Sequence, residues 1–187
     1  MGAGSLVAVS GRPYTRAMKT VVLGDPPPAL ASLIAERQRL GLDRRDEIWE
    51  GDYHVVPGPS GDHAHLGSRV IRFLGPFGDR AGLVGSLEFN IGRLGDFRVP
   101  DLGFHRGVPT GVWQDGAAVV VEIRSPWDET YEKFGFYFDH GVEELLVIEP
   151  EARTVQWYAR GADRFEPVDR SALLACSAEE LVAGLGW

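Results

Sequence analysis

Two segments in the first half of the chain carry hydrophobic residues at the spacing of an amphipathic helix. In residues 29–40 and again in residues 63–73, apolar side chains recur three or four positions apart. Gly41 predicts the end of the first helix, because glycine is favoured just beyond a helix end. Gly75 and Pro76 predict the end of the second helix, because proline disrupts the hydrogen bonding of a helix interior.

Two shorter helices are predicted in the second half of the chain. Residues 131–140 are rich in aromatic side chains and are followed by Gly141, a natural helix cap. The other helix is predicted over residues 177–183, where Ser177 and Glu180 have the spacing of a capping box. These two helices lie on either side of a run of strand-like segments.

The remaining apolar segments have the pattern of strands. Most alternate between apolar and polar residues, whereas residues 117–123 form a near-continuous apolar run, as expected for a strand that is covered on both faces. The predicted strands span residues 53–57, 83–91, 98–105, 117–123, 145–148 and 154–158. The order of helices and strands predicts one mixed α/β domain over residues 25–187. Residues 1–24 have few large apolar side chains, which predicts a flexible tail.

Composition narrows the class of protein. A chain of 187 residues can bury one core without disulfides, and its single cysteine, Cys176, favours a cytoplasmic protein. No apolar run approaches the ~20 residues of a membrane span, so no membrane partner is expected. The net charge of −8 argues against a protein that coats nucleic acid, although it leaves room for a local basic groove.

Two carboxylates stand within predicted strands. Asp101 follows a proline inside the segment Val99–Leu102, and Glu122 interrupts the strongest buried-strand pattern. If these strands are neighbours, the two carboxylates can converge at one edge of the sheet, where oxygen donors suit Mg²⁺ or Mn²⁺. The alternative is that each carboxylate lies at a strand end or forms an ion pair.

The order of several sequence blocks resembles the Uma2 family, formerly a domain of unknown function. The blocks are Asp46–Tyr53 with His63 after it, Arg98–Leu102, Val121–Pro126, Lys133 and Gly141–Pro150. Together they cover roughly residues 30–160. This family belongs to the PD-(D/E)XK nuclease superfamily, so the resemblance implies a restriction-endonuclease-like core in which helices flank a mixed central β-sheet.

The resemblance also implies the metal ligands. Asp101 matches the aspartate of the Pro-Asp motif, and Glu122 matches the acidic residue of the second half-motif. The backbone carbonyl of Ile123 would complete the protein ligands of Mg²⁺ or Mn²⁺. The motif lysine is replaced by Arg124, which suits phosphate binding but is a poor proton acceptor. The alternative for Arg124 is an ion pair with Glu122 or Asp128.

Further roles follow from the same resemblance. Lys133, one of only two lysines, fits the place of a substitute catalytic lysine on the following helix. Glu47 fits an acidic residue on the N-terminal helix that supports the metal, with Glu50 as the second choice. The alternatives are that Lys133 and Glu47 are solvated surface residues. For His63 the residues favour a helix-capping or surface role.

The resemblance implies a Mg²⁺-dependent endonuclease that hydrolyses DNA phosphodiester bonds. A homodimer is expected by analogy, because cleavage of both strands needs two sites. The alternative is a nuclease-fold module that binds or assembles without turnover, which would be consistent with Arg124 and the acidic charge. A hydrolase with a serine or cysteine nucleophile is disfavoured, because no histidine follows Cys176 and no glycine elbow surrounds Ser125.

Overall fold

The computed structural model describes residues 20–22, 24, 26–125 and 129–187. Most of the predicted tail, residues 1–24, therefore lies outside the described residues, as do Pro126 and Asp128. Near the end of that segment, Thr20–Val22 forms strand β1, which pairs with the strand at Asp52–Val55.

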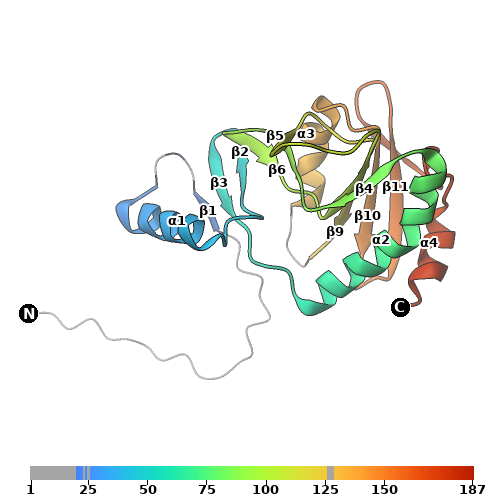
Figure 1. The fold of residues 1–187 in the computed structure, drawn as a ribbon, viewed down its shortest axis with the longest axis horizontal. Coiled ribbons are helices and arrows are strands. Elements are labelled where there is room, and N and C mark those ends of the chain that lie inside the picture. The colour runs from blue at the N-terminus through green and yellow to red at the C-terminus, as the bar shows by residue number, and fades with distance from the viewer. Residues whose placement is uncertain (1–19, 23, 25, 126–128) are drawn as a thin grey trace, which may run out of the picture.

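The described strands form two mixed six-stranded sheets (Figure 1). In sheet A the order is β1, β3 (Asp52–Val55), β2 (Glu47–Trp49), β6 (Asp96–Arg98), β5 (Asn90–Arg93) and β8 (Trp113–Gln114). In sheet B it is β12 (Phe165–Val168), β11 (Thr154–Arg160), β10 (Glu144–Glu149), β9 (Val119–Ile123), β7 (Leu102–His105) and β4 (Val84–Leu87). The sequence predicted a single central sheet, so sheet A is an addition to that prediction.

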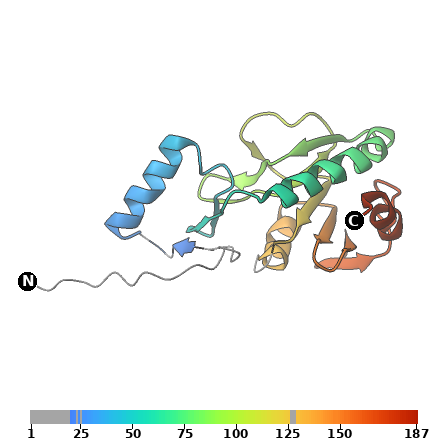
Figure 2. The ribbon, with the colours of Figure 1, turned by 90° about the horizontal axis from the view of Figure 1, so that it is seen from below.

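Helices lie on both faces of sheet B (Figure 2). These helices are α2 (Gly61–Ala81), α3 (Phe134–Asp139) and α4 (Ala178–Leu185), and a 3₁₀ turn, η1 (Thr130–Lys133), leads into α3. Helix α1 (Pro28–Leu40) lies apart from sheet B, near β1 and β3 (Figure 1). Val119 and Val121 pack with α2 and α4, whereas Val120 packs with α3. This alternation explains the continuous apolar run of β9, because both of its faces are buried.

Helix α2 is longer than the sequence predicted. It continues through Pro76 to Ala81 and ends at Gly82, which has the left-handed φ of 68°. Leu74 and Gly78 are buried in this segment, and a Cβ at Gly78 would lie only 2.6 Å from the ring of Phe104. Packing of the last turns on sheet B therefore outweighs the hydrogen bond that proline cannot make.

Two predicted strands are each divided in the structure. Segment 83–91 becomes β4 and β5, separated by a turn in which Glu88 has a φ of 40°. Segment 98–105 becomes β6 and β7, which belong to different sheets. The mixed α/β class predicted from the sequence is confirmed. None of the helices in the described part of the chain has the length and apolar character needed to cross a membrane.

Candidate active site

Asp101 and Glu122 stand side by side because their strands are neighbours. Strands β7 and β9 pair antiparallel, with Leu102 opposite Val121. Continuing this register by one residue puts Asp101 opposite Glu122, and both side chains are more than nine-tenths buried. The strand pairing on which the sequence argument depended is therefore present. Burying two carboxylates together is costly unless donors or cations compensate them.

Asp101 is held by three donors from distant parts of the chain. The backbone N–H of Ile123 donates to Oδ2 at 2.8 Å, His63 Nε2 lies 2.9 Å from Oδ1, and the Arg45 guanidinium also donates to Oδ1. Burial acts to raise the pKa of Asp101, but the hydrogen bond to His63 and the charges of His63 and Arg45 outweigh it and lower this pKa. Asp101 is therefore a carboxylate at neutral pH.

Glu122 lies in a different electrostatic environment. Its Oε1 accepts a hydrogen bond from the Tyr137 hydroxyl, and Lys133 Nζ lies 3.3 Å away. Burial raises the pKa of Glu122 to about 7, and repulsion from Asp101 and Glu47 adds to this effect against the attraction of Lys133. Around Glu122, the attraction of Lys133 therefore does not offset the combined cost of burial and of repulsion by Asp101 and Glu47.

Lys133 connects Glu122 to a second buried acid, Glu47. Lys133 directly precedes α3, and its Nζ donates to Glu47 Oε1 at 2.9 Å. Burial acts to lower the pKa of Lys133, but attraction by Glu122 and Glu47 keeps it above its ordinary value. Glu47 also accepts hydrogen bonds from the Val99 N–H at 2.8 Å and from Trp49 Nε1 at 2.7 Å. Neither Lys133 nor Glu47 is a solvated surface residue.

The expected position of Glu47 on an N-terminal helix is wrong. Glu47 begins strand β2, where it pairs with His54 of β3. Ile48 and Trp49 follow it, and large apolar residues of this kind favour a strand. The second choice, Glu50, is exposed in the turn after β2, and its backbone N–H is bonded to Asp96.

The side chain of Arg124 contacts Glu149 and Tyr131. Its Nη1 donates to Glu149 Oε1 at 2.6 Å, and its guanidinium lies over the ring of Tyr131. The structure therefore pairs Arg124 with Glu149, which the sequence alternatives did not include. Asp128, the other suggested partner, lies outside the described residues.

Three residues of the site were missed by sequence reasoning. The expectation for His63 was a cap or surface role, whereas its ring reaches Asp101 and lies 3.5 Å from Ser125 Oγ. The helix cap is supplied by Ser60, whose hydroxyl accepts from the His63 backbone N–H. The signal that could have identified His63 is its place in the sequence blocks that carry the family resemblance. Arg45 and Tyr137 were not singled out from the sequence.

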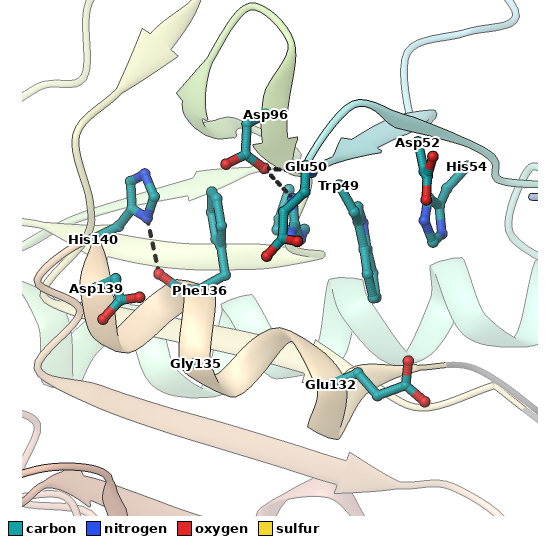
Figure 3. Close-up of a pocket in the computed structure, with 11 residues that line it drawn as sticks. Trp49, Glu50, Asp52, His54, Asp96, Glu132, Gly135, Phe136, Asp139 and His140 are labelled. Atoms are coloured by element: carbon teal, nitrogen blue, oxygen red, sulfur yellow. Dashed lines mark hydrogen bonds and ion pairs between the residues drawn. The ribbon is translucent and has the colours of Figure 1, made fainter. Parts of the chain in front are cut away.

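A cleft of about 630 Å³ lies between sheet A and helix α3 (Figure 3). Trp49, which donates to Glu47, forms part of its wall together with Phe136 of α3. The cleft carries several acidic groups, which are Glu50, Asp52, Asp96, Glu132 and Asp139. Trp49 connects the wall of this cleft to Glu47, whereas Asp101, Glu122 and Lys133 are not among the residues that line it.

The donor set fits a hard divalent cation in its chemistry. Carboxylate oxygens of Asp101 and Glu122 are the ligands that Mg²⁺ prefers, and the raised pKa of Glu122 marks a position where added positive charge is favourable. Within the described ranges, no three His, Cys, Asp or Glu side chains are grouped so that they could hold a metal ion. Any ion would therefore rely on two carboxylates, backbone oxygen and water.

Comparison with known proteins supplies the family. The Uma2 family model, described as "Putative restriction endonuclease", matches residues 35–186. No curated protein matches the chain. A crystal structure of "a putative nuclease belonging to DUF820" from Anabaena variabilis is similar, with a TM-score of 0.61 and 20% identity over 75% of this chain and 90% of that one. At this identity the likeness shows the fold, and it confirms the restriction-endonuclease-like core predicted from the sequence.

Proposed function

Because the chain belongs to the Uma2 family of restriction-endonuclease-like proteins, we propose that it is a divalent-metal-dependent endonuclease acting on DNA. One observation carries the proposal: Asp101, directly before β7, stands beside Glu122 of the neighbouring strand β9, and Lys133 bridges Glu122 and Glu47 next to them. Buried carboxylates that stand next to a lysine are the side chains that metal-assisted phosphodiester hydrolysis requires.

In this proposal Asp101, Glu122 and the Ile123 carbonyl would hold Mg²⁺ or Mn²⁺. When bound, such an ion supplies Lewis acidity and acidifies a water molecule. Ile123 already donates its N–H to Asp101, which fixes the carboxylate against the strand that carries Glu122. His63 and Arg45 orient the same carboxylate from the opposite side. The ligands are thus supported by elements that are far apart in sequence.

Lys133 would act as a fixed positive charge. Its raised pKa keeps it protonated at neutral pH, so it stabilises negative charge on the phosphate oxygens rather than accepting a proton. Glu47 accepts from Lys133 and holds it in place, and Glu47 is itself fixed by two further donors, the Val99 N–H and Trp49 Nε1. Arg124 would bind a neighbouring DNA phosphate, for which its partly exposed guanidinium is suited when Glu149 releases it.

Two measurements test this function. Plasmid DNA is incubated with Mg²⁺ or Mn²⁺ and the wild-type protein, Glu122→Ala or Lys133→Ala, and only the wild type is expected to cleave it. Isothermal titration with Mn²⁺ compares the wild type with Asp101→Ala, which is expected to lose binding. Equal Mn²⁺ binding by both proteins would refute the metal assignment, and equal cleavage by the lysine variant would refute the role of Lys133.

A second candidate is a nuclease-fold module that binds nucleic acid without cleaving it. The pairing of Asp101 Oδ1 with both Arg45 and His63 favours this candidate, because these groups already compensate one ligand carboxylate. It predicts Mg²⁺-independent DNA binding and intact plasmid at every metal concentration. Metal-dependent plasmid cleavage by the wild-type protein would therefore refute this candidate.

The proposal includes a homodimer in the cytoplasm. Cleavage of both DNA strands needs two sites, which a two-fold symmetric dimer supplies. The helix α1 has no buried residue, and Leu33 and Leu40 on it are each more than half exposed. Such a face is available to a second copy. Sedimentation of the wild type and a Leu33→Glu/Leu40→Glu variant tests this assembly, and identical monomers would refute it.

A further inference from the structure

Five planar side chains from sheet A and helix α3 form one continuous stack beside the site. The ring of His54 stacks on Trp49, with centroids 4.2 Å apart, and the ring of Phe136 stacks on His140 at 3.9 Å. The Arg98 guanidinium joins the two pairs, because its Cζ lies 4.5 Å from the Trp49 ring centroid and 4.1 Å from that of Phe136. Figure 3 shows the four rings in a row along α3.

Arg98 is fixed to sheet A on one side and covers helix α3 on the other. Its Nη1 donates to the Ile48 carbonyl at 2.8 Å and to Asp96 Oδ1 at 3.0 Å, and the residue is only 5% exposed. Gly92 of β5 leaves room for the stack, since a Cβ there would lie 2.9 Å from Phe136. The Arg98 guanidinium thus holds the Phe136 ring of helix α3 at a fixed distance from sheet A.

Both ends of the Glu47–Lys133 ion pair are attached to this stack. On sheet A, Trp49 Nε1 donates to Glu47 Oε2 at 2.7 Å. On the helix side, Lys133 directly precedes α3 and lies three residues before Phe136. The Lys133 Nζ reaches Glu47 Oε1 at 2.9 Å across this gap. Moving α3 away from sheet A would therefore separate the ammonium from the carboxylate.

We propose that Arg98 and Trp49 are positioning residues: their stack clamps helix α3 against sheet A and thereby places Lys133 between Glu47 and Glu122. The effect on cleavage rests on the nuclease function proposed above, whereas the effect on the position of Lys133 does not. Arginine suits this place because its planar group covers a ring on each face while its N–H groups donate in the plane. Lysine cannot do both.

The direct test observes Lys133 itself. The chain has only two lysines, Lys19 and Lys133, so protein labelled with ¹⁵N-lysine gives two side-chain ammonium signals, which Lys133→Met assigns. The Lys133 ammonium is buried and hydrogen-bonded, so its protons exchange slowly and its signal is visible. Arg98→Gln is expected to abolish that slowly exchanging signal, and kcat is expected to fall about 100-fold with KM little changed.

Arg160→Gln is the matched control. The Arg160 Cζ lies 3.8 Å from the ring centroid of Phe138 on the same helix, and its Nη1 donates to the Phe138 carbonyl at 2.6 Å. It makes the same kinds of contact as Arg98, but the ring it covers is not in the stack. We expect Arg160→Gln to keep the Lys133 signal and the wild-type kcat.

Trp49→Phe is the second variant, for the case in which Arg98→Gln does not fold. It keeps a ring in the stack and removes only the donor to Glu47. The expected result is a shifted Lys133 signal and a roughly 10-fold lower kcat with unchanged KM. The positioning role is overturned if Arg98→Gln folds and its Lys133 signal is unchanged. If Arg98→Gln does not fold, an unchanged Lys133 signal in Trp49→Phe overturns it. If the wild-type protein cleaves no DNA but Arg98→Gln still loses the Lys133 signal, the clamp is supported and only the nuclease function is refuted.

Discussion

Two buried glutamates on neighbouring strands of sheet B have opposite surroundings. Glu144 begins β10, and Glu122 lies near the end of β9, which pairs parallel to β10. Glu144 accepts hydrogen bonds from the Ser171 hydroxyl and from the backbone N–H groups of Ala172 and Leu173, all in one turn. Those three donors satisfy the carboxylate locally and hold the C-terminal turn on the sheet.

Glu122 is equally buried but is compensated by a cation and surrounded by other acids. Its neighbours include Lys133, the Tyr137 hydroxyl, Asp101 and Glu47. Burial of a strand carboxylate therefore does not by itself indicate chemistry. A set of local N–H and O–H donors indicates structure, whereas several acids sharing one lysine indicate a site where charge can be changed by a ligand.

The largest expected effect separates the two glutamates by activity. Glu122→Gln removes a proposed metal ligand, so DNA cleavage is expected to fall about 100- to 1,000-fold. Glu144→Gln keeps its shape and lies away from Lys133, so its cleavage rate is expected to stay within about threefold of wild type. Initial rates on plasmid DNA measure both. Similar losses in the two variants would contradict the distinction.

Stability should show the reverse order. Glu144→Ala leaves the buried Ser171 hydroxyl and two partly buried backbone N–H groups without their acceptor, which is expected to lower the free energy of unfolding by about 3 kcal/mol. Glu143→Ala is the control, because Glu143 is partly exposed and pairs with Arg106, so its loss should cost less than about 1 kcal/mol. Urea unfolding measures both values, and equal losses would argue against a structural role for Glu144.

The pH dependence of stability should carry a signature of Glu122. Its folded pKa of about 7 exceeds its ordinary value of 4.5, so the folded state binds the proton more tightly than the unfolded state. This contribution is present below pH 4.5 and is lost as the pH rises through 7. In metal-free protein, Glu122→Gln should therefore gain about 2 to 3 kcal/mol relative to wild type between pH 4.5 and 8. Thermal unfolding across that range measures the gain, and a pH-independent difference would contradict it.

The smallest expected effect concerns Tyr137. Tyr137→Phe removes the hydroxyl that donates to Glu122, and this hydrogen bond helps to lower the pKa of that carboxyl. The pKa of Glu122 should rise further, and the free energy of unfolding should fall by about 1 kcal/mol. NMR titration of ¹³C-labelled glutamate measures the pKa. Tyr158→Phe, whose ring packs on Phe134 in the same cluster, is the control and should leave this pKa unchanged.

Local pattern was sufficient where neighbouring residues decide the structure. The helix predicted over residues 29–40 with its Gly41 cap is found as Pro28–Leu40, and the predicted capping box of Ser177 and Glu180 is confirmed. Pattern failed where packing competes with propensity. Helix α2 passes Pro76 because its last turns are buried on sheet B, and no local signal reports that burial.

Local sequence pattern determined the buried strand that carries Glu122, because this carboxylate interrupts an apolar run of its own neighbours. Asp101 was predicted inside a strand, but it lies in the break between β6 and β7, which belong to different sheets. Which groups surround the two carboxylates depends on the tertiary structure. Lys133 and Glu47 are 86 positions apart, and His63 and Asp101 are 38 apart, so their contacts depend on how sheet A and the helices pack. Hydrophobic periodicity in a sequence indicates which face of a helix or strand is buried. It does not indicate the partner of a buried charge, because that partner depends on how the face packs in three dimensions.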